Sequence, residues 1–324
     1  MNEFELIARF FQRAPRSADV RVGIGDDAAV IAPTPGMEYA VTVDMLVEGR
    51  HFAVGADPRR LGHKALAVNL SDLAAMGAMP RYVLLAGALP GADEAWVTAF
   101  MGGFDALARQ YDVELVGGDT TRGPRNLCIT AIGELPAGSA LTRAGANPGD
   151  RVYVSGSLGD AALALAVAAG KTEVDARSRA ALAHRLDAPE PRVALGVALR
   201  GIASAAIDVS DGLAGDLGHI VDMSKVGAAL SLAAVPCAPS LRAKLAGTHK
   251  EREIALQCVL AGGDDYELLF TAPPPLGERI EALALALRLP LTAIGEVTAE
   301  PGIVVRDERG DRLAALPHAF DHFR

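Results

Sequence analysis

The sequence predicts two domains of mixed helices and strands, and three observations lead to that expectation. The chain has 324 residues, which is more than one hydrophobic core usually organises. Half of the residues are hydrophobic and 22% are charged, a balance typical of folded domains. Segments with strand-like and helix-like spacing of apolar residues follow one another along the chain. A stretch rich in Gly, Pro, Ala and Ser (136–150) divides them, so we expect domains over 1–138 and 149–324.

The first half is expected to contain three helices and four strands. The spacing of apolar residues predicts helices over 3–13, 57–77 and 93–111. Alternation predicts strands over 39–49, 81–88 and 126–135, together with a strand that ends in "LVGGDTTRG" (115–123).

Two of these segments carry polar residues on a single face. In the first strand, Thr42 and Asp44 share the face opposite to Val41, because side chains alternate along a strand. In the second helix, Asn69 and Asp72 are three residues apart and therefore lie on one face. Carboxylates are thus expected on regular elements as well as in turns.

The second half begins with a strand at "RVYVSG" (151–156) and a helix within "SLGDAALALAVAAG" (157–170). The tripeptide Gly-Lys-Thr at 170–172 ends this helix instead of opening one, and Leu165 stands where a P-loop needs glycine. A strand, an acidic turn and a helix are expected in succession over 204–224. A strand-like unit is expected from Gly262, followed by a helix over 277–288 and strands near 291–297 and 302–306.

Composition excludes several classes of protein. A net charge of −9 leaves no basic surplus for non-specific binding of nucleic acid. The three cysteines form no ligand-spaced pair, which is typical of reduced thiols in the cytoplasm. The acidic, amphipathic start is not a signal peptide, and the longest apolar helical run, 161–170, is too short to span a bilayer. We expect a cytoplasmic protein that binds neither nucleic acid nor membrane.

Acidic residues beside glycines or at strand ends recur through both halves. The segment "GIGDDAAV" (23–30) carries two adjacent carboxylates where a turn needs only one. Comparable positions are Asp44, Asp72, Asp119, Asp208, Asp211, Asp216, Asp264 and Asp265. Two carboxylates about 4 Å apart repel by roughly 4 kcal/mol at an effective dielectric constant near 20. If these groups converge, cations must lie among them.

The expected cations are several Mg²⁺ ions arrayed along a polyphosphate. The candidate ligands are oxygen atoms, which select a hard cation, and Mg²⁺ combines one or two carboxylates with phosphate oxygens. A Ca²⁺ loop of the D-x-D-x-D-G kind is absent from "DVSDGLAGD" (208–216). The predicted helix start at Gly212–Leu213 is expected to offer free N–H groups to phosphate.

Seven segments taken together resemble a known family. They are "GIGDDAAV", "TVDMLVEGRHF", "KALAVNLSDLAAMGAMP", "VGGDTTRGP", "ALTRAGANPGD", "AIDVSDGLAGDLGHI" and "GGDDYELLF". In this order they resemble the bacterial thiamine-monophosphate kinases, of the superfamily that includes aminoimidazole ribonucleotide synthetase. The resemblance runs from about Phe4 to the final "FDHFR". It implies an α+β N-terminal domain whose strands form a homodimer, an α/β C-terminal domain, and ATP-dependent phosphorylation of thiamine monophosphate to thiamine diphosphate without a phosphoenzyme.

The resemblance also implies roles for individual residues. The Mg²⁺ positions are Asp27, Thr42, Val43 (through its carbonyl), Asp44, Asp72, Asp119, Asp208 and Asp211. The nucleotide positions are Tyr111, Gly118, Asp119, Arg143 and Ser210, and the positions that contact the substrate are His51, Asp264 and Phe320. Asp264 departs from the Glu of relatives, and Pro317 could stand in the place given to Phe320. No residue is expected to act as a general base.

Simpler interpretations of some residues stay open at this point. Asp26 could be a turn residue or could support the ligands from behind, His51 could be a surface histidine, Tyr111 could be part of the core, and Arg143 could be solvated. The alternatives to a thiamine-monophosphate kinase are another ATP-using member of the superfamily and a non-catalytic regulatory protein that binds Mg²⁺ and nucleotide. Turnover of ATP on addition of thiamine monophosphate separates the kinase from the regulator.

Overall fold

The computed structural model describes residues 3–317, which form two compact units. The N-terminal unit comprises Met1–Leu73 and Ala78–Ala140, and the C-terminal unit comprises Ala74–Gly77 and Leu141–Arg324. Each unit has its own sheet. The prediction of a mixed α/β fold is confirmed, and each unit is described separately below.

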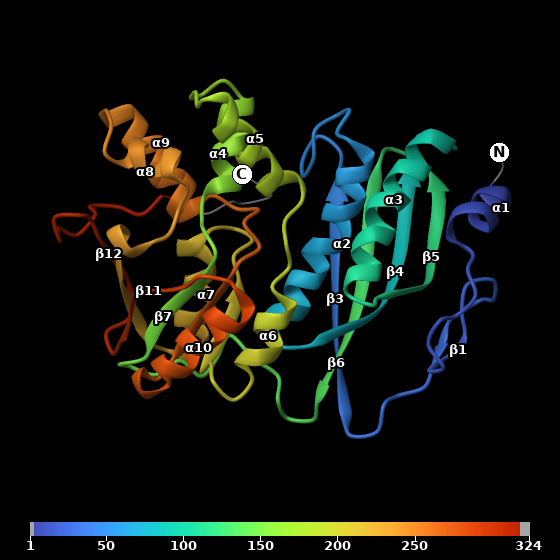
Figure 1. Cartoon of the computed structure of the whole chain (residues 1–324), viewed down its shortest axis with the longest axis horizontal. Helices are drawn as coiled ribbons and strands as arrows, with labels where there is room; N and C mark the ends of the chain where they lie inside the picture. The colour runs from blue at the N-terminus through green and yellow to red at the C-terminus, as the bar shows by residue number, and fades with distance from the viewer. Residues whose placement is uncertain (1–2, 318–324) are drawn as a thin grey trace. The chain divides into compact units, whose positions relative to one another are not determined.

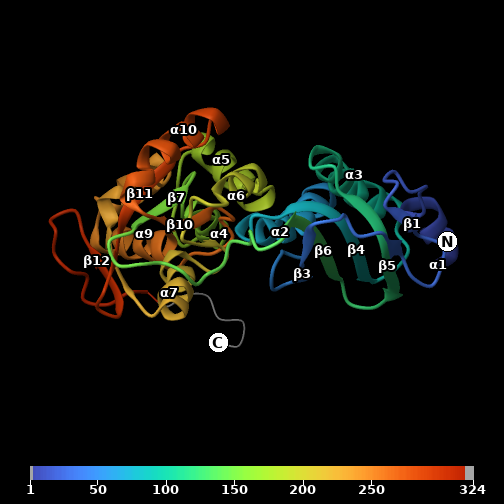
Figure 2. The same ribbon diagram turned by 90° about the horizontal axis from the view of Figure 1, so that it is seen from below.

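The N-terminal unit is built on a four-stranded sheet in the order β3-β6-β4-β5. Its strands are β3 (Met37–Val47), β4 (Met79–Leu89), β5 (Glu114–Arg122) and β6 (Asn126–Pro136). β6 is antiparallel to β3 and β4, whereas β4 and β5 are parallel. A parallel pair needs a crossover, and α3 (Glu94–Gln110) makes it. Both views show α3 and α2 (Pro58–Ala75) on one face of the sheet (Figure 1, Figure 2).

The two faces of this sheet differ in what covers them. Val41 pairs with Ile132, and Ile132 pairs with Tyr82, so these side chains share the face away from α2 and α3. The short pair β1 (Val20–Val22) and β2 (Val30–Ile31) packs over Tyr82 on this face. The β3 part stays open: Tyr39, Val41, Val43 and Met45 are 41–64% exposed. The chain before β1 forms α1 (Glu3–Leu6) and the π-helix η1 (Ile7–Phe11).

The C-terminal unit contains a six-stranded sheet in the order β12-β9-β11-β7-β10-β8. Its strands are β7 (Arg151–Ser155), β8 (Ala205–Asp208), β9 (Gly227–Ser231), β10 (Leu268–Ala272), β11 (Leu291–Thr298) and β12 (Gly302–Arg306). Neighbouring strands are antiparallel except β9 and β12. The helices are α4 (Asp160–Ala168), α5 (Ala176–Asp187), α6 (Val193–Leu199), α7 (Leu213–Ser224), α8 (Pro239–Leu245), α9 (His249–Ala261) and α10 (Gly277–Leu287), with short 3₁₀ turns η2 (Leu232–Ala234) and η3 (Pro274–Leu276).

The sequence missed several elements of the C-terminal unit. It assigned nothing to α5, α6, α8, α9 and β9. The strand expected from Gly262 begins only at Leu268, because Asp264 and Tyr266 have φ angles of 69° and 52°, which a strand does not tolerate. The Gly-Lys-Thr tripeptide does follow the end of α4, as predicted. Of the helices that the structure describes, none combines the length and apolar composition that a membrane span requires.

Candidate functional site

In the N-terminal unit, candidate residues meet where β3 lies against α2. Thr42 Oγ1 donates a hydrogen bond of 2.5 Å to Asp72 Oδ2. The Asp44 N–H donates to Asn69 Oδ1 at 3.1 Å, and the buried Asn69 amide donates in turn to the Ala65 carbonyl. The predicted strand face and helix face are therefore confirmed, and the structure brings them together. The Val43 side chain points to the open face. Only its backbone carbonyl could therefore act as a ligand on the side of the strand that faces α2.

The turn with two adjacent carboxylates gives each a different setting. Asp26 Oδ1 accepts the N–H of the next residue, Asp27, at 2.9 Å. Gly25, just before it, lies in a turn and has a φ of 121°. Asp27 is exposed. This local bond supports a turn role for Asp26, and the Mg²⁺ role of Asp27 stays a prediction.

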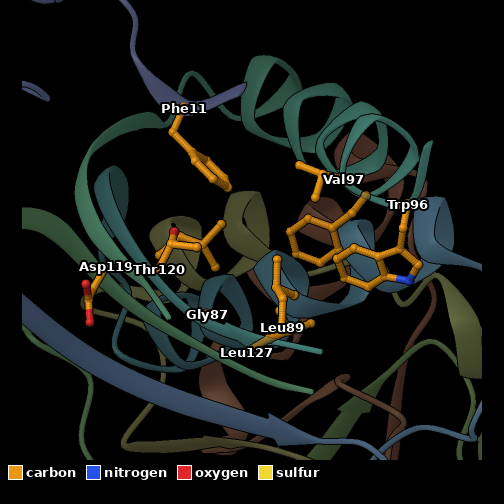
Figure 3. Close-up of a pocket in the computed structure, with 10 residues that line it drawn as sticks. Phe11, Gly87, Leu89, Trp96, Val97, Asp119, Thr120 and Leu127 are labelled. Carbon is orange, nitrogen blue, oxygen red and sulfur yellow. The ribbon is translucent and has the colours of Figure 1, made fainter. Parts of the chain in front are cut away.

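Gly118 and Asp119 lie on β5, beside β4. A Cβ on Gly118 would approach the Leu85 carbonyl oxygen to 1.9 Å, so the two backbones can meet this closely only with glycine there. Asp119 is exposed. Figure 3 shows its carboxylate turned away from a cluster of aromatic rings, whereas Thr120 points toward that cluster.

The aromatic cluster encloses a pocket on the helix-covered face of the same sheet. Phe11, Trp96 and Phe100 line it together with the side chains of β4 (Figure 3). The rings of Trp96 and Phe100 stack with centroids 5.2 Å apart. About 20 Å³ is open to water inside it, room for a single water molecule. This pocket is too small for a nucleotide in the arrangement observed, so we do not assign it to the candidate site.

His51 belongs to a turn that follows β3. Its Nδ1 accepts the Val47 N–H at 3.0 Å, so the neutral ring carries its proton on Nε2. The turn is tied to the sheet by Glu48, which forms a short ion pair with Arg125. The Arg125 guanidinium also stacks 4.6 Å from the centre of the Trp96 ring. The imidazole is therefore held in one orientation.

Tyr111 ends α3, and its N–H bonds to the Leu107 carbonyl at 3.1 Å. The side chain is half-buried, which leaves both the core interpretation and the nucleotide interpretation open.

In the C-terminal unit, Asp208 ends β8 and is buried, and Ser210 and Asp211 are half-buried in the turn that follows. The prediction that the helix start at Gly212–Leu213 offers free N–H groups is wrong for Gly212 and stays a prediction for Leu213. A single oxygen of the buried Asp216 accepts the N–H groups of Ser210, Asp211 and Gly212 at 3.0–3.1 Å. Burial and the nearby charge of Asp211 raise the pKa of Asp216 to about 7.

The loop that carries Asp264 lies directly against this turn. The Asp264 N–H donates to the Ser210 carbonyl at 2.9 Å, and the Tyr266 N–H donates to the Val209 carbonyl at 2.8 Å. The Tyr266 hydroxyl donates to Asp264 Oδ1 at 3.0 Å. The structure therefore brings the predicted substrate contact Asp264 beside Ser210, a predicted nucleotide contact. Two non-glycine residues with positive φ in one short loop mark a conformation that the surrounding contacts must enforce.

Two candidate residues lie elsewhere. Arg143 is exposed, and its carbonyl accepts a hydrogen bond of 3.2 Å from the Ser224 hydroxyl on α7. Phe320 lies outside the described residues, and Pro317, which is half-buried, is the last residue described.

The residues after Asp264 form a buried polar network that sequence reasoning missed. Glu267 is fully buried and accepts hydrogen bonds from Arg185, Arg192 and Ser155 at 2.6–2.7 Å. Burial acts to raise the pKa of Glu267, but the two arginines and Ser155 hold it below its ordinary value. No local signal marked Glu267, because the strand that follows it is buried on both faces and shows no alternation.

Asp265 is also buried, yet it has a different set of partners. Its carboxylate accepts the N–H of Gly159 at 2.6 Å and that of Ala161 at 3.4 Å. Burial raises the pKa of Asp265 well above its ordinary value. The pair in "GGDDYE" thus divides: Asp264 stands beside the acidic turn, and Asp265 anchors the loop to the start of α4.

The donor set fits a hard divalent cation. Every candidate ligand offers a carboxylate, hydroxyl or carbonyl oxygen. Over residues 3–317, no three His, Cys, Asp or Glu side chains form a group that could hold a metal ion unaided. The donors occur instead as small sets such as Thr42 with Asp72. This suits Mg²⁺, which keeps several waters and takes one or two carboxylates together with phosphate oxygens.

Comparison with known proteins adds an independent line of argument. Residues 25–135 match the N-terminal domain of AIR synthase related proteins, and residues 147–308 match their C-terminal domain. The chain is 45% identical to the thiamine-monophosphate kinase of Escherichia coli K12 over 325 residues, 99% of this chain and 98% of that one.

Two solved structures are similar over most of the chain. The thiamine-monophosphate kinase of Stenotrophomonas maltophilia K279a superposes with a TM-score of 0.84 at 45% identity, covering 96% of both chains. AaThiL complexed with AMPPCP and TMP superposes with a TM-score of 0.77 at 29% identity, covering 90% of this chain and 89% of that one.

Proposed function

The chain belongs to the AIR synthase related proteins and, among them, to the thiamine-monophosphate kinase family, and from that premise we propose that it transfers the γ-phosphoryl group of ATP to thiamine monophosphate. The observation that carries the proposal is 45% identity to such a kinase over 99% of the chain. The relative complexed with AMPPCP and TMP supports the choice of both substrates. The product would be thiamine diphosphate, formed by direct in-line transfer.

The transfer needs positioning and charge neutralisation more than proton transfer. The attacking group is a phosphate oxygen that is already anionic near neutral pH, so the chain need not supply a strong general base. When bound, Mg²⁺ ions would neutralise and align the two polyanions. We infer that their ligands come from Asp27, Thr42, the Val43 carbonyl, Asp44, Asp72, Asp119, Asp208 and Asp211.

The chain's own groups would orient the two substrates. We assign the nucleotide contacts to Tyr111, Gly118, Asp119, Arg143 and Ser210, and the substrate contacts to His51, Asp264 and Phe320. The close backbone packing at Gly118 supports a fixed nucleotide-binding strand. The Nε2–H of His51 is suited to donate to a phosphate oxygen, because Nδ1 is already occupied as an acceptor.

We also propose that the protein is a homodimer that associates through β3. The open face of this strand carries Tyr39, Val41, Val43 and Met45, which are 41%, 64%, 59% and 52% exposed. A contiguous apolar face of this kind marks an interaction surface. V41K together with V43K should convert the dimer to a monomer in light scattering, while the surface variant L285K should not. A wild-type monomer at micromolar concentration would contradict this assignment.

The thiols support a proposal for the cellular compartment. Cys128, Cys237 and Cys258 are all free, and burial raises the pKa of each, which makes them inert structural thiols. We therefore propose a cytoplasmic location.

A product assay tests the function directly. Purified protein with ATP and Mg²⁺ is offered thiamine monophosphate, thiamine or aminoimidazole-pathway substrates, and products are separated by chromatography. We expect thiamine diphosphate only from thiamine monophosphate. ATP binding without turnover would instead identify a regulatory protein, and turnover of another substrate would identify a different ATP-using activity.

A further inference from the structure

The turn after β8 is organised by one buried carboxylate. Asp216, in the first turn of α7, is 2% exposed. Its Oδ2 accepts N–H bonds from Ser210 at 3.1 Å, from Asp211 at 3.1 Å and from Gly212 at 3.0 Å. A helix N-terminus ordinarily presents such groups to an anion. Here the anion is part of the chain.

The opposite side of the turn is fixed as well. The carbonyls of Val209 and Ser210 accept hydrogen bonds from the loop that carries Asp264 and Tyr266. Gly212 has a φ of 111°, and a Cβ there would lie 2.7 Å from the backbone of Ala261. The turn is therefore held in one conformation by contacts on both sides, and its side chains remain as the groups that a ligand can use.

The charge of this arrangement favours a cation over a phosphate. Asp216 stands next to Asp211, and its carboxyl group occupies the N–H groups of Ser210, Asp211 and Gly212. The half-buried Asp211 carboxylate beside it creates a negative potential that attracts a divalent ion and repels a bare polyphosphate. The turn thus differs from a P-loop, in which the backbone N–H groups themselves cradle the phosphates.

We propose that Asp216 is a positioning residue of the phosphoryl-transfer site, which acts through Ser210 and Asp211. It fixes the two residues and keeps their N–H groups from phosphate, so that nucleotide binds at this turn only together with a cation. The inference rests on the proposed function, in which Ser210 contacts nucleotide and Asp211 contacts Mg²⁺. It assigns Asp216 a role in the site without making it a ligand.

Binding of AMPPCP in the presence of Mg²⁺, measured by calorimetry, tests this coupling. The variants are D216N, D211N and the double variant, with D222N as the control, because Asp222 lies exposed on the same helix. We expect D216N and D211N each to weaken binding about tenfold. In the double variant the loss should stay within about twofold of D211N alone, because residues that act through one another are not additive.

The melting temperature of each variant confirms that it is folded during the binding measurement. Binding of AMPPCP without Mg²⁺ supplies a readout that a merely structural role would not move: D216S, which frees the N–H groups of Ser210, Asp211 and Gly212, should bind AMPPCP more tightly than wild type under that condition. Equal losses of binding in both backgrounds, or full binding by D216N, would overturn the proposal. If D216N fails to fold, D216S, which is smaller and uncharged, replaces it with the same expectation.

The test distinguishes this inference from the proposed function. A protein that makes no thiamine diphosphate but shows non-additive binding keeps the positioning role and loses the kinase assignment. A protein that makes thiamine diphosphate but shows additive binding losses keeps the kinase assignment and loses the positioning role.

Discussion

The two units hold their candidate residues in different ways. In the N-terminal unit, Thr42 projects from β3 and Asp72 from α2, and the Thr42 hydroxyl donates a hydrogen bond to the Asp72 carboxylate between the two elements. In the C-terminal unit, the turn at 208–212 and the loop at 262–267 are irregular, and buried groups behind them fix their shape. Regular elements position side chains through their own backbone hydrogen bonds, whereas loops depend on added partners.

This difference predicts how each region responds to substitution. Changing a side chain on β3 or α2 should remove one functional group and leave the fold intact. Changing a buried partner behind the C-terminal loops should cost stability as well as activity. Substitutions at Glu267, Asp72, Thr42 and Tyr266 test that contrast.

Removal of the charge on Glu267 should have the largest effect. The change E267Q removes the buried carboxylate that Arg185 and Arg192 share and leaves Arg192 with the exposed Glu190 alone, and breaking a buried ion pair costs about 3–5 kcal/mol. We expect urea unfolding to show a loss of this size. R279A, which removes a side chain on α10, is the control, and a loss below about 1 kcal/mol in E267Q would contradict the assigned role.

The contribution of Glu267 also has a defined pH dependence. Its pKa is lowered in the folded state from an ordinary value of 4.5. The stabilisation is therefore complete above that value and is lost as the pH falls through the lower folded pKa. The stability difference between wild type and E267Q should shrink as the pH falls below about 4. A difference that stays constant between pH 7 and pH 3 would show that packing, and not charge, holds this loop.

Substitution of Asp72 should give the opposite pattern. In D72N the fold should persist, because the side chain keeps its size and is only half-buried, while kcat should fall about 100-fold or more from loss of a charge at the transfer site. D57N, at the other end of α2 where Asp57 accepts the Arg60 N–H, serves as the control. Near-normal turnover by D72N would exclude it from the metal-binding set.

Thr42 should contribute less than the carboxylate to which it donates. T42V keeps the shape of the side chain but removes the hydrogen bond to Asp72, so we expect about a tenfold fall in kcat/KM and a loss of about 1 kcal/mol of stability. The control is V30T, a change at an exposed valine on β2. If both variants behave alike, the polar face of β3 has no special role.

The same contrast explains how much of each region could be predicted from the sequence. The faces of β3 and α2 were predictable, because Thr42 with Asp44 and Asn69 with Asp72 obey the periods of a strand and a helix. That the two faces meet depends on tertiary packing, which no local spacing encodes. Asp216 resembled one more acidic ligand, because the sequence does not reveal which N–H groups a carboxylate will accept. The left-handed conformations of Asp264 and Tyr266 were hidden for a related reason: contacts with the 208–211 turn impose them against local preference.

Substitution of Tyr266 should have the smallest effect of the four. It tests whether a side-chain hydrogen bond, in addition to the backbone hydrogen bonds, positions the C-terminal loop. Its hydroxyl donates to Asp264 Oδ1 at 3.0 Å, while its backbone N–H holds the loop to Val209. Y266F removes only the first of these, and the loop should keep its shape. This hydrogen bond to a carboxylate is only half-buried, so we take its contribution as about 1 kcal/mol and expect the KM for thiamine monophosphate to rise about fivefold with kcat within twofold.

The matched control for Y266F is Y153F, which removes a hydroxyl from a tyrosine stacked on Phe270 in the same unit. A fall in kcat without a change in KM would mean that the hydroxyl serves the transfer step and not the orientation of Asp264. Equal changes in both variants would mean that the loop tolerates loss of the contact. In that case the backbone hydrogen bonds to the 208–211 turn alone position Asp264, and the C-terminal region would depend on its main chain as fully as β3 depends on its pairing with β6.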